Sequence, residues 1–128
     1  MQDFKKLQVW QRARYLTRAV YELSADLPPS EQFSLQSQMR RASISVCSNI
    51  AEGRGRRGDR EFRRFLIVAM GSACELESEL ILVVDLKFVG ERQQSAVLAQ
   101  LIEVKRMLSG LIEQLSPRPR SSQLLADG

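Results

Sequence analysis

The strongest constraint in the sequence is an unbroken row of apolar residues between residues 62 and 83. The row recurs at steps of three and four residues and consists of Phe62, Leu66, Ala69, Ala73, Leu76, Leu80 and Val83. This spacing places every member on one face of an α-helix. Because Asp59 follows a glycine and is a good N-cap, we predict a helix over residues 59–88. Such a helix must bury its apolar face against other helices, which indicates an all-α protein.

Three further stretches have the same helical spacing. Their apolar rows are Leu7, Trp10, Ala13, Leu16, Val20, Leu23 and Leu27; then Leu35, Met39, Ala42, Val46, Asn49 and Gly53; and finally Val97, Leu101, Val104, Leu108, Leu111 and Leu115. We expect a first helix over residues 4–27, a second with Ser34 as its N-cap, and a fourth between Gly90 and Pro117. Four helices with short connections predict an antiparallel up-down-up-down four-helix bundle over residues 1–116, with 117–128 as a flexible tail.

The helix over residues 59–88 carries a second apolar row, which one bundle core does not require. It consists of Ile67, Met70, Cys74, Ile81, Val84 and Phe88. We therefore expect self-association, with Ile81 and Val84 as candidate contact residues. Gly71 and Ser72 lie in the same helix, and their small side chains favour a close contact with another helix.

The composition excludes several classes of function. The chain has 128 residues and no histidine, and histidine is the usual general base and metal ligand near neutral pH. Glu75, Glu77 and Glu79 alone do not make a di-metal site, and two cysteines, Cys47 and Cys74, cannot close a zinc site, so we read both as buried free thiols. We therefore expect no enzyme activity, no metal and no cofactor. The start MQDFKK has no apolar region and the longest apolar run, LILVV, is short, which predicts a cytoplasmic protein without a membrane partner.

The predicted topology concentrates the positive charge at one end of the bundle. The start of the first helix, the turn between the second and third helices, and the end of the fourth helix meet there, and we call this end the basic pole. Its candidate contact residues are Lys5, Lys6, Arg12, Arg54, Arg56, Arg57, Arg60, Arg63 and Arg64. Arginines beside glycines, leading into a helix start, suit a phosphate. The alternative is a solvated face that only keeps the protein soluble.

Two polar residues precede the turn, and each has two interpretations. Asn49 falls on the apolar row of the second helix, where it either fixes register and assembly or carries a function. Glu52 lies one helical turn before Arg56 and either holds the basic turn in place or is solvated.

The sequence around this turn is similar to a small bacterial family of four-helix bundles. The family is named after proteins encoded in intervening sequences of 23S ribosomal RNA genes, and it looks related to accessory variability proteins of diversity-generating retroelements. The features that carry the resemblance are Phe4, Leu7, Val9 and Trp10, Pro28 with Glu31, Leu35 with Gln38, Arg41-Ala42, Ser45, Asn49-Ile50-Ala51-Glu52-Gly53, Arg56, Phe62, Phe65-Leu66, Ala69, Gly71-Ser72 and Glu75-Leu76-Glu77. One departure is Val46-Cys47, where the family pattern has Ile-Pro, so we expect a straighter second helix here.

The resemblance implies a ring-like homopentamer around a basic channel. For the retroelement relatives it also implies nucleic-acid binding together with a reverse transcriptase. We interpret the chain as a non-enzymatic oligomeric accessory protein that binds RNA or DNA phosphates through the basic pole. The alternative is a protein-interaction scaffold that docks an acidic partner on the same arginines.

Overall fold

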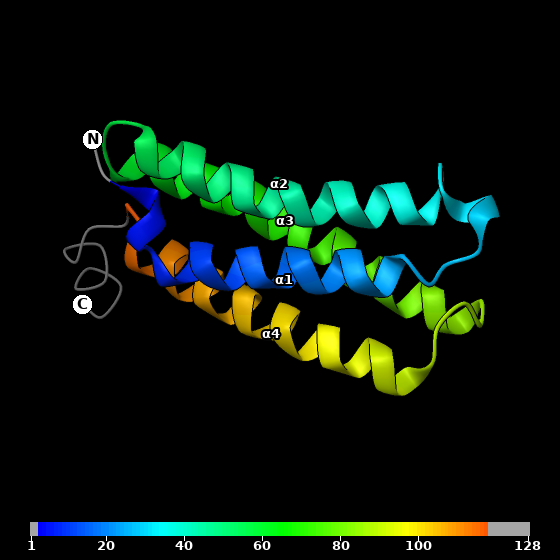
Figure 1. The fold of residues 1–128 in the computed structure, drawn as a ribbon. Helices are drawn as coiled ribbons and strands as arrows, with labels where there is room; N and C mark the ends of the chain where they lie inside the picture. Colours follow the sequence, from blue (N-terminus) through cyan, green and yellow to red (C-terminus); the bar gives the residue numbers. More distant parts are fainter. Residues whose placement is uncertain (1–2, 118–128) are drawn as a thin grey trace.

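The computed structural model describes residues 3–117, and in this range it is a four-helix bundle without strands. Figure 1 shows the helices running antiparallel along one long axis. The elements are η1 (Phe4–Lys6), α1 (Gln8–Ser24), η2 (Pro29–Glu31), α2 (Leu35–Gly55), α3 (Asp59–Asp85) and α4 (Glu91–Gln114). Each helix packs against the next one in the chain, and α4 packs back against α1. The predicted up-down-up-down bundle is confirmed, and no helix in 3–117 has the length and apolar character to cross a membrane.

The core contains the apolar rows that the sequence predicts. Every member of the row from Phe62 to Val83 is buried, and Phe65 joins it from the side of α3 that faces α2. In α2, however, Ile50 is fully buried while Asn49 is only half-buried. The placement of Asn49 in the core row was therefore wrong, because the 3.6-residue period turns its neighbour Ile50 inward.

Several helix boundaries differ from the expected ones. Asp3 caps the short η1 through a hydrogen bond from the Lys5 backbone N–H (3.0 Å), and extended backbone at Leu7 separates η1 from α1. At the start of α3 the N-cap is Gly58, not Asp59. Gly58 has φ of 85°, which glycine adopts without the strain that a side chain would add. Ser34 is at the N-cap of α2, but the Glu31 carboxylate, not the serine, accepts from the Leu35 N–H at 3.3 Å.

Both cysteines are free thiols, as expected, but only one lies within the bundle. Cys47 is half-buried and contacts the Thr17 hydroxyl at 3.5 Å, and burial raises the pKa of its thiol. Cys74 is exposed, so its predicted burial was wrong. It belongs to the part of the second apolar row that this chain leaves uncovered.

Helices α2 and α3 approach each other closely because the residues between them are small. The Ser45 and Ser72 hydroxyl oxygens lie 2.8 Å apart across the pair. Nearer the turn, a Cβ added to Gly53 would lie 2.6 Å from the Phe65 Cβ and 3.3 Å from the Phe62 carbonyl oxygen. These separations are shorter than van der Waals contact, so no side chain fits at Gly53.

One carboxylate of α3 is buried. Glu79 is 7% exposed, and its Oε1 has no hydrogen-bond partner among the described residues. Burial, followed by the charge of Glu75 one turn earlier in α3, raises the Glu79 pKa to about 7, while Arg41 of α2 acts in the opposite direction. Folding therefore favours the protonated acid.

We predict that Gly53→Ala destabilises the fold by about 1–3 kcal/mol, because the new methyl group must push the backbones of α2 and α3 apart. The control is Gly110→Ala in α4, where an added Cβ meets nothing within 4 Å. That change should stabilise the protein by about 0.5–1 kcal/mol through helix propensity. Urea unfolding measures both. Equal effects of the two substitutions would contradict the close approach at Gly53.

We predict that Glu79→Gln removes a pH-dependent loss of stability. Because the folded pKa of Glu79 lies above its ordinary value of 4.5, the stabilisation is complete below pH 4.5 and is lost as pH rises through about 7. The variant should gain up to about 3 kcal/mol over the wild type between pH 5 and pH 8. Urea unfolding at both pH values tests this, and a pH-independent difference would show that Glu79 is not buried as an acid.

Candidate nucleic-acid interface

The structure brings three distant segments to the basic pole. Figure 1 shows η1, the turn between α2 and α3, and the end of α4 at one end of the bundle. The two remaining connections lie at the opposite end. Arg118 and Arg120, which the sequence also places at the basic pole, lie outside the described residues. The grouping of the turn with the start of the first helix and the end of the fourth is thus present in the fold.

Two hollows flank the start of α3. The first has a volume of about 400 Å³ and is lined by Arg54, Gly55, Arg56, Arg57, Gly58, Asp59 and Phe62. The second has a volume of about 420 Å³ and is lined by Arg60, Glu61, Arg63, Arg64, Ile67 and Pro117. The six arginines predicted from the turn are therefore divided between two adjacent surfaces, one on each side of the helix start.

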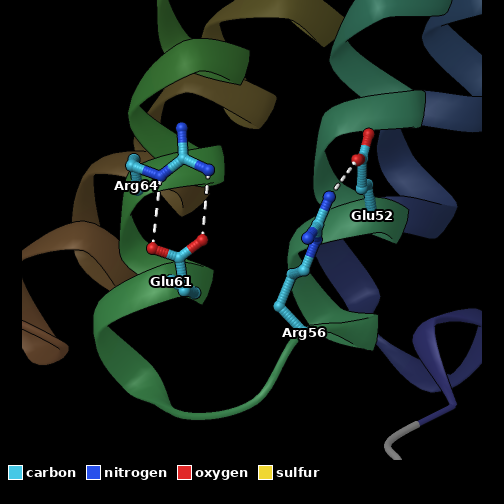
Figure 2. Close-up of polar contacts among 4 residues, drawn as sticks. All are labelled: Glu52, Arg56, Glu61 and Arg64. Atoms are coloured by element: carbon cyan, nitrogen blue, oxygen red, sulfur yellow. Dashed lines mark hydrogen bonds and ion pairs between the residues drawn. The ribbon is translucent and has the colours of Figure 1, made fainter.

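Two of these arginines are paired with carboxylates three or four residues earlier in the chain. Arg56 Nη2 lies 2.7 Å from Glu52 Oε2, and Arg64 donates to both Glu61 oxygens at 3.1 and 3.3 Å. Figure 2 shows the two pairs facing each other, one from α2 and one from α3. The hydrogen bond from Arg64 lowers the Glu61 pKa, and the same bond raises the Arg64 pKa. Glu52 therefore pairs with Arg56, as one of its two interpretations expects, although both side chains are about half exposed.

Buried phenylalanine rings support three of the arginines. The guanidinium carbons of Arg56 and Arg64 lie 5.1 and 4.6 Å from the centroid of the Phe65 ring, and that of Arg54 lies 5.3 Å from the Phe62 ring. These are cation–π distances. This arrangement was not predicted from the sequence, because the two phenylalanines follow the turn in the chain and do not lie within it. The sequence feature that could have indicated it is the pair Phe62 and Phe65, which lie three residues apart at the start of α3.

The other arginines of the turn have different surroundings. Arg63 Nε donates to the Ile112 carbonyl at 3.0 Å, which ties α3 to the last turn of α4, where a cation is favourable. Arg57 and Arg60 are exposed, and within residues 3–117 neither makes a hydrogen bond or ion pair through its side chain. They extend from the end of the turn and the first turn of α3. These two cations are the most available ones for a ligand.

The start of α3 adds hydrogen-bond donors beside them. Gly58 provides no side-chain cap, and the Phe62 N–H is the first that bonds back, to the Gly58 carbonyl at 3.2 Å. The N–H groups of the preceding turn therefore point out of the helix end, as at helix termini that bind anions. Asp59 and Glu61 in this turn reduce the local positive charge.

The remaining predicted contact residues lie apart from the turn. Lys5 and Lys6 belong to η1 and are exposed, with the Lys5 ammonium 4.0 Å from the Asp3 carboxylate. Arg12 lies in a separate hollow between α1 and α4, which Tyr15, Gln100 and Glu103 also line. Arg12 therefore lines neither of the two hollows beside the turn, and its contact with a ligand stays a prediction.

The residues predicted to set the assembly fall into two groups. Gly53 is buried in the contact between α2 and α3, whereas the Asn49 amide donates to the Ser45 carbonyl at 2.8 Å within α2 itself. Val84 is half-buried against the core. Gly71 and Ile81 are exposed, and an added Cβ at Gly71 would meet nothing within 4 Å. The close helix contact predicted at Gly71 is therefore absent within one chain, and Ser72 makes the contact with α2 instead.

The sequence profile of the 23S rRNA-intervening sequence proteins matches residues 5–110. The chain belongs to this family. A crystal structure of a protein of unknown function from the S23 ribosomal protein family of Bacteroides thetaiotaomicron has the same fold, with a TM-score of 0.76 and 21% identity. The match covers 81% of this chain and 97% of the other. No curated protein matches the sequence. Within residues 3–117, no group of three or more histidine, cysteine or acidic side chains is arranged to hold a metal ion.

Proposed function

We propose that this family member is a non-enzymatic protein that binds RNA or DNA through phosphate contacts at the basic pole. The observation that carries the proposal is the pair Arg57 and Arg60, exposed and unpaired within the described chain, beside the uncapped start of α3. A guanidinium offers a planar fork of donors that matches phosphate oxygens, and the N–H groups of the helix start add to it.

The geometry favours contacts to the nucleic-acid backbone over contacts to bases. The rings at the basic pole, Phe62 and Phe65, are buried beneath arginines, so they present no open face for a base to stack on. Contacts from arginines to phosphates position a nucleic acid without reading its sequence. We therefore propose binding that depends strongly on salt and weakly on sequence.

We further propose that the chain assembles into a ring-like homo-oligomer, for which the family resemblance implies five copies. The support is the outer face of α3, where Ile67, Val68, Ile81, Leu82 and Leu86 are all exposed by 43–53%. Several large apolar side chains exposed on one helix mark an interaction site more often than a solvated surface. A cyclic assembly would repeat the basic pole once per protomer, so several weak phosphate contacts would act together.

We predict that Arg57→Gln combined with Arg60→Gln weakens binding of a mixed-sequence single-stranded RNA about tenfold or more at 50 mM salt. The plot of log K against log salt should become less steep by about 1.4, because two phosphate contacts are lost. Fluorescence anisotropy across a salt series measures both. The matched control is Arg92→Gln, an exposed arginine at the start of α4 at the opposite end. RNA binding that is absent at low salt, or equal in both variants, would contradict the proposal.

We predict that Ile81→Glu disperses the oligomer into monomers and leaves the helix content unchanged, because it places a charge in the apolar face of α3. Light scattering should give a mass several times 14.6 kDa for the wild type and about 14.6 kDa for the variant. The control is Ile102→Glu on α4, where the isoleucine has a similar exposure, 53% against 48% for Ile81. A monomeric wild type, or equal dispersal by both changes, would contradict the assignment of this face.

A further inference from the structure

Four arginines of the turn fall into two kinds, and this difference affects which anions can bind at the basic pole. Arg57 and Arg60 are unpaired among the described residues, whereas Arg56 and Arg64 are already occupied by Glu52 and Glu61. The two closed pairs come from opposite helices and cover one ring, because both guanidiniums lie over Phe65. Figure 2 shows that the pairs stand on either side of the turn.

We propose that Glu52 and Glu61 are the specificity-determining residues of this surface: they exclude the carboxylates of an acidic protein and admit the closely spaced phosphates of a nucleic acid. The inference rests on the proposed nucleic-acid binding and names the kind of anion that the site selects.

Carboxylates of a ligand and of the protein compete for the same guanidinium groups. A carboxylate from an acidic protein would replace Glu52 or Glu61 with a group of the same chemistry, and the residue in place has the advantage of belonging to the same helix. The displaced carboxylate would also remain nearby and repel the newcomer. A single acidic side chain therefore gains little by binding at either pair.

A nucleic acid differs because its charges are dense and surrounded by condensed counterions. Each phosphate that a cation neutralises releases counterions to the solution, which favours binding at low salt. Exposed ion pairs of this kind are weak, and both partners in each pair are roughly half exposed. A strand that is already held by Arg57 and Arg60 brings further phosphates close enough to open them.

The ring of Phe65 makes the exchange easier. A guanidinium can stay stacked on the ring while its edge turns from a carboxylate to a phosphate, so the cation–π contact is kept in both states. The same ring serves both arginines, so each remains anchored while the other exchanges. The arginine side chains then need little reordering when the pairs open.

The test compares the wild type with Glu52→Gln, Glu61→Gln and the double variant. Glu103→Gln is the control, because Glu103 pairs with Arg106 three residues later on α4, in the same spacing as Glu61 and Arg64. It makes the same change in net charge as each single variant, away from the turn. The probes are a labelled mixed-sequence 20-nucleotide RNA and a labelled poly-glutamate peptide of similar length, both measured by anisotropy at 50 and 150 mM salt.

The proposal expects each single variant to bind the RNA more tightly than the control variant, and the double variant to bind it about tenfold more tightly than the wild type, with a steeper salt dependence. Poly-glutamate should bind measurably to the double variant and not to the wild type. RNA binding that is equal in the double variant and the control, or weaker in the double variant, overturns this inference and leaves the proposed function standing. Absence of RNA binding by all five proteins overturns the proposed function and the inference together.

Discussion

The close approach of α2 and α3 at Gly53 is the contact on which the basic pole depends. Because Gly53 has no side chain, the start of α3 packs against the backbone of α2, and Phe65 occupies the space that a side chain would take. This places the last turn of α2 beside the first turns of α3. Arg56 from one helix and Arg64 from the other then lie over the same ring. The polar surface is therefore positioned by an apolar contact beneath it.

The arrangement separates cations with structural roles from cations available to a ligand. Arg63 ties α3 to the end of α4, and Arg56 and Arg64 are paired within their own helices. Arg57 and Arg60 are exposed, and neither has an ion pair within residues 3–117. A count of positive charges overstates the capacity of such a surface, because four of the six arginines, Arg54, Arg56, Arg63 and Arg64, already make contacts within the chain. Membership of the family does not by itself assign a function, and this division of the arginines is what supports phosphate binding.

Much of the fold follows from the sequence, because helical spacing and short connections allow few arrangements other than an antiparallel bundle. The row from Phe62 to Val83 was predicted member by member and is buried throughout. The failures occur where the period alone cannot decide which side of a helix faces inward. Asn49 and Ile50 are neighbours, and only the packing of α2 on α3 turns Ile50 into the core. The N-cap of α3 is Gly58 and not Asp59, because a turn this short needs a residue with positive φ at that position.

The site was predictable in position but not in detail. The charge pattern located the turn, yet the pairing of Arg56 with Glu52 and the stacking on Phe65 require the distance between two helices, which a one-dimensional pattern does not contain.

The most direct measurement of the central claim follows the arginine side-chain Nε–H signals by NMR while a mixed-sequence single-stranded RNA is added. We expect the Arg57 and Arg60 signals to shift first, while the Arg63 signal stays in place because its Nε–H is bonded to the Ile112 carbonyl. Shifts confined to arginines of the opposite end, such as Arg40 and Arg92, or no shifts at all, would contradict the account.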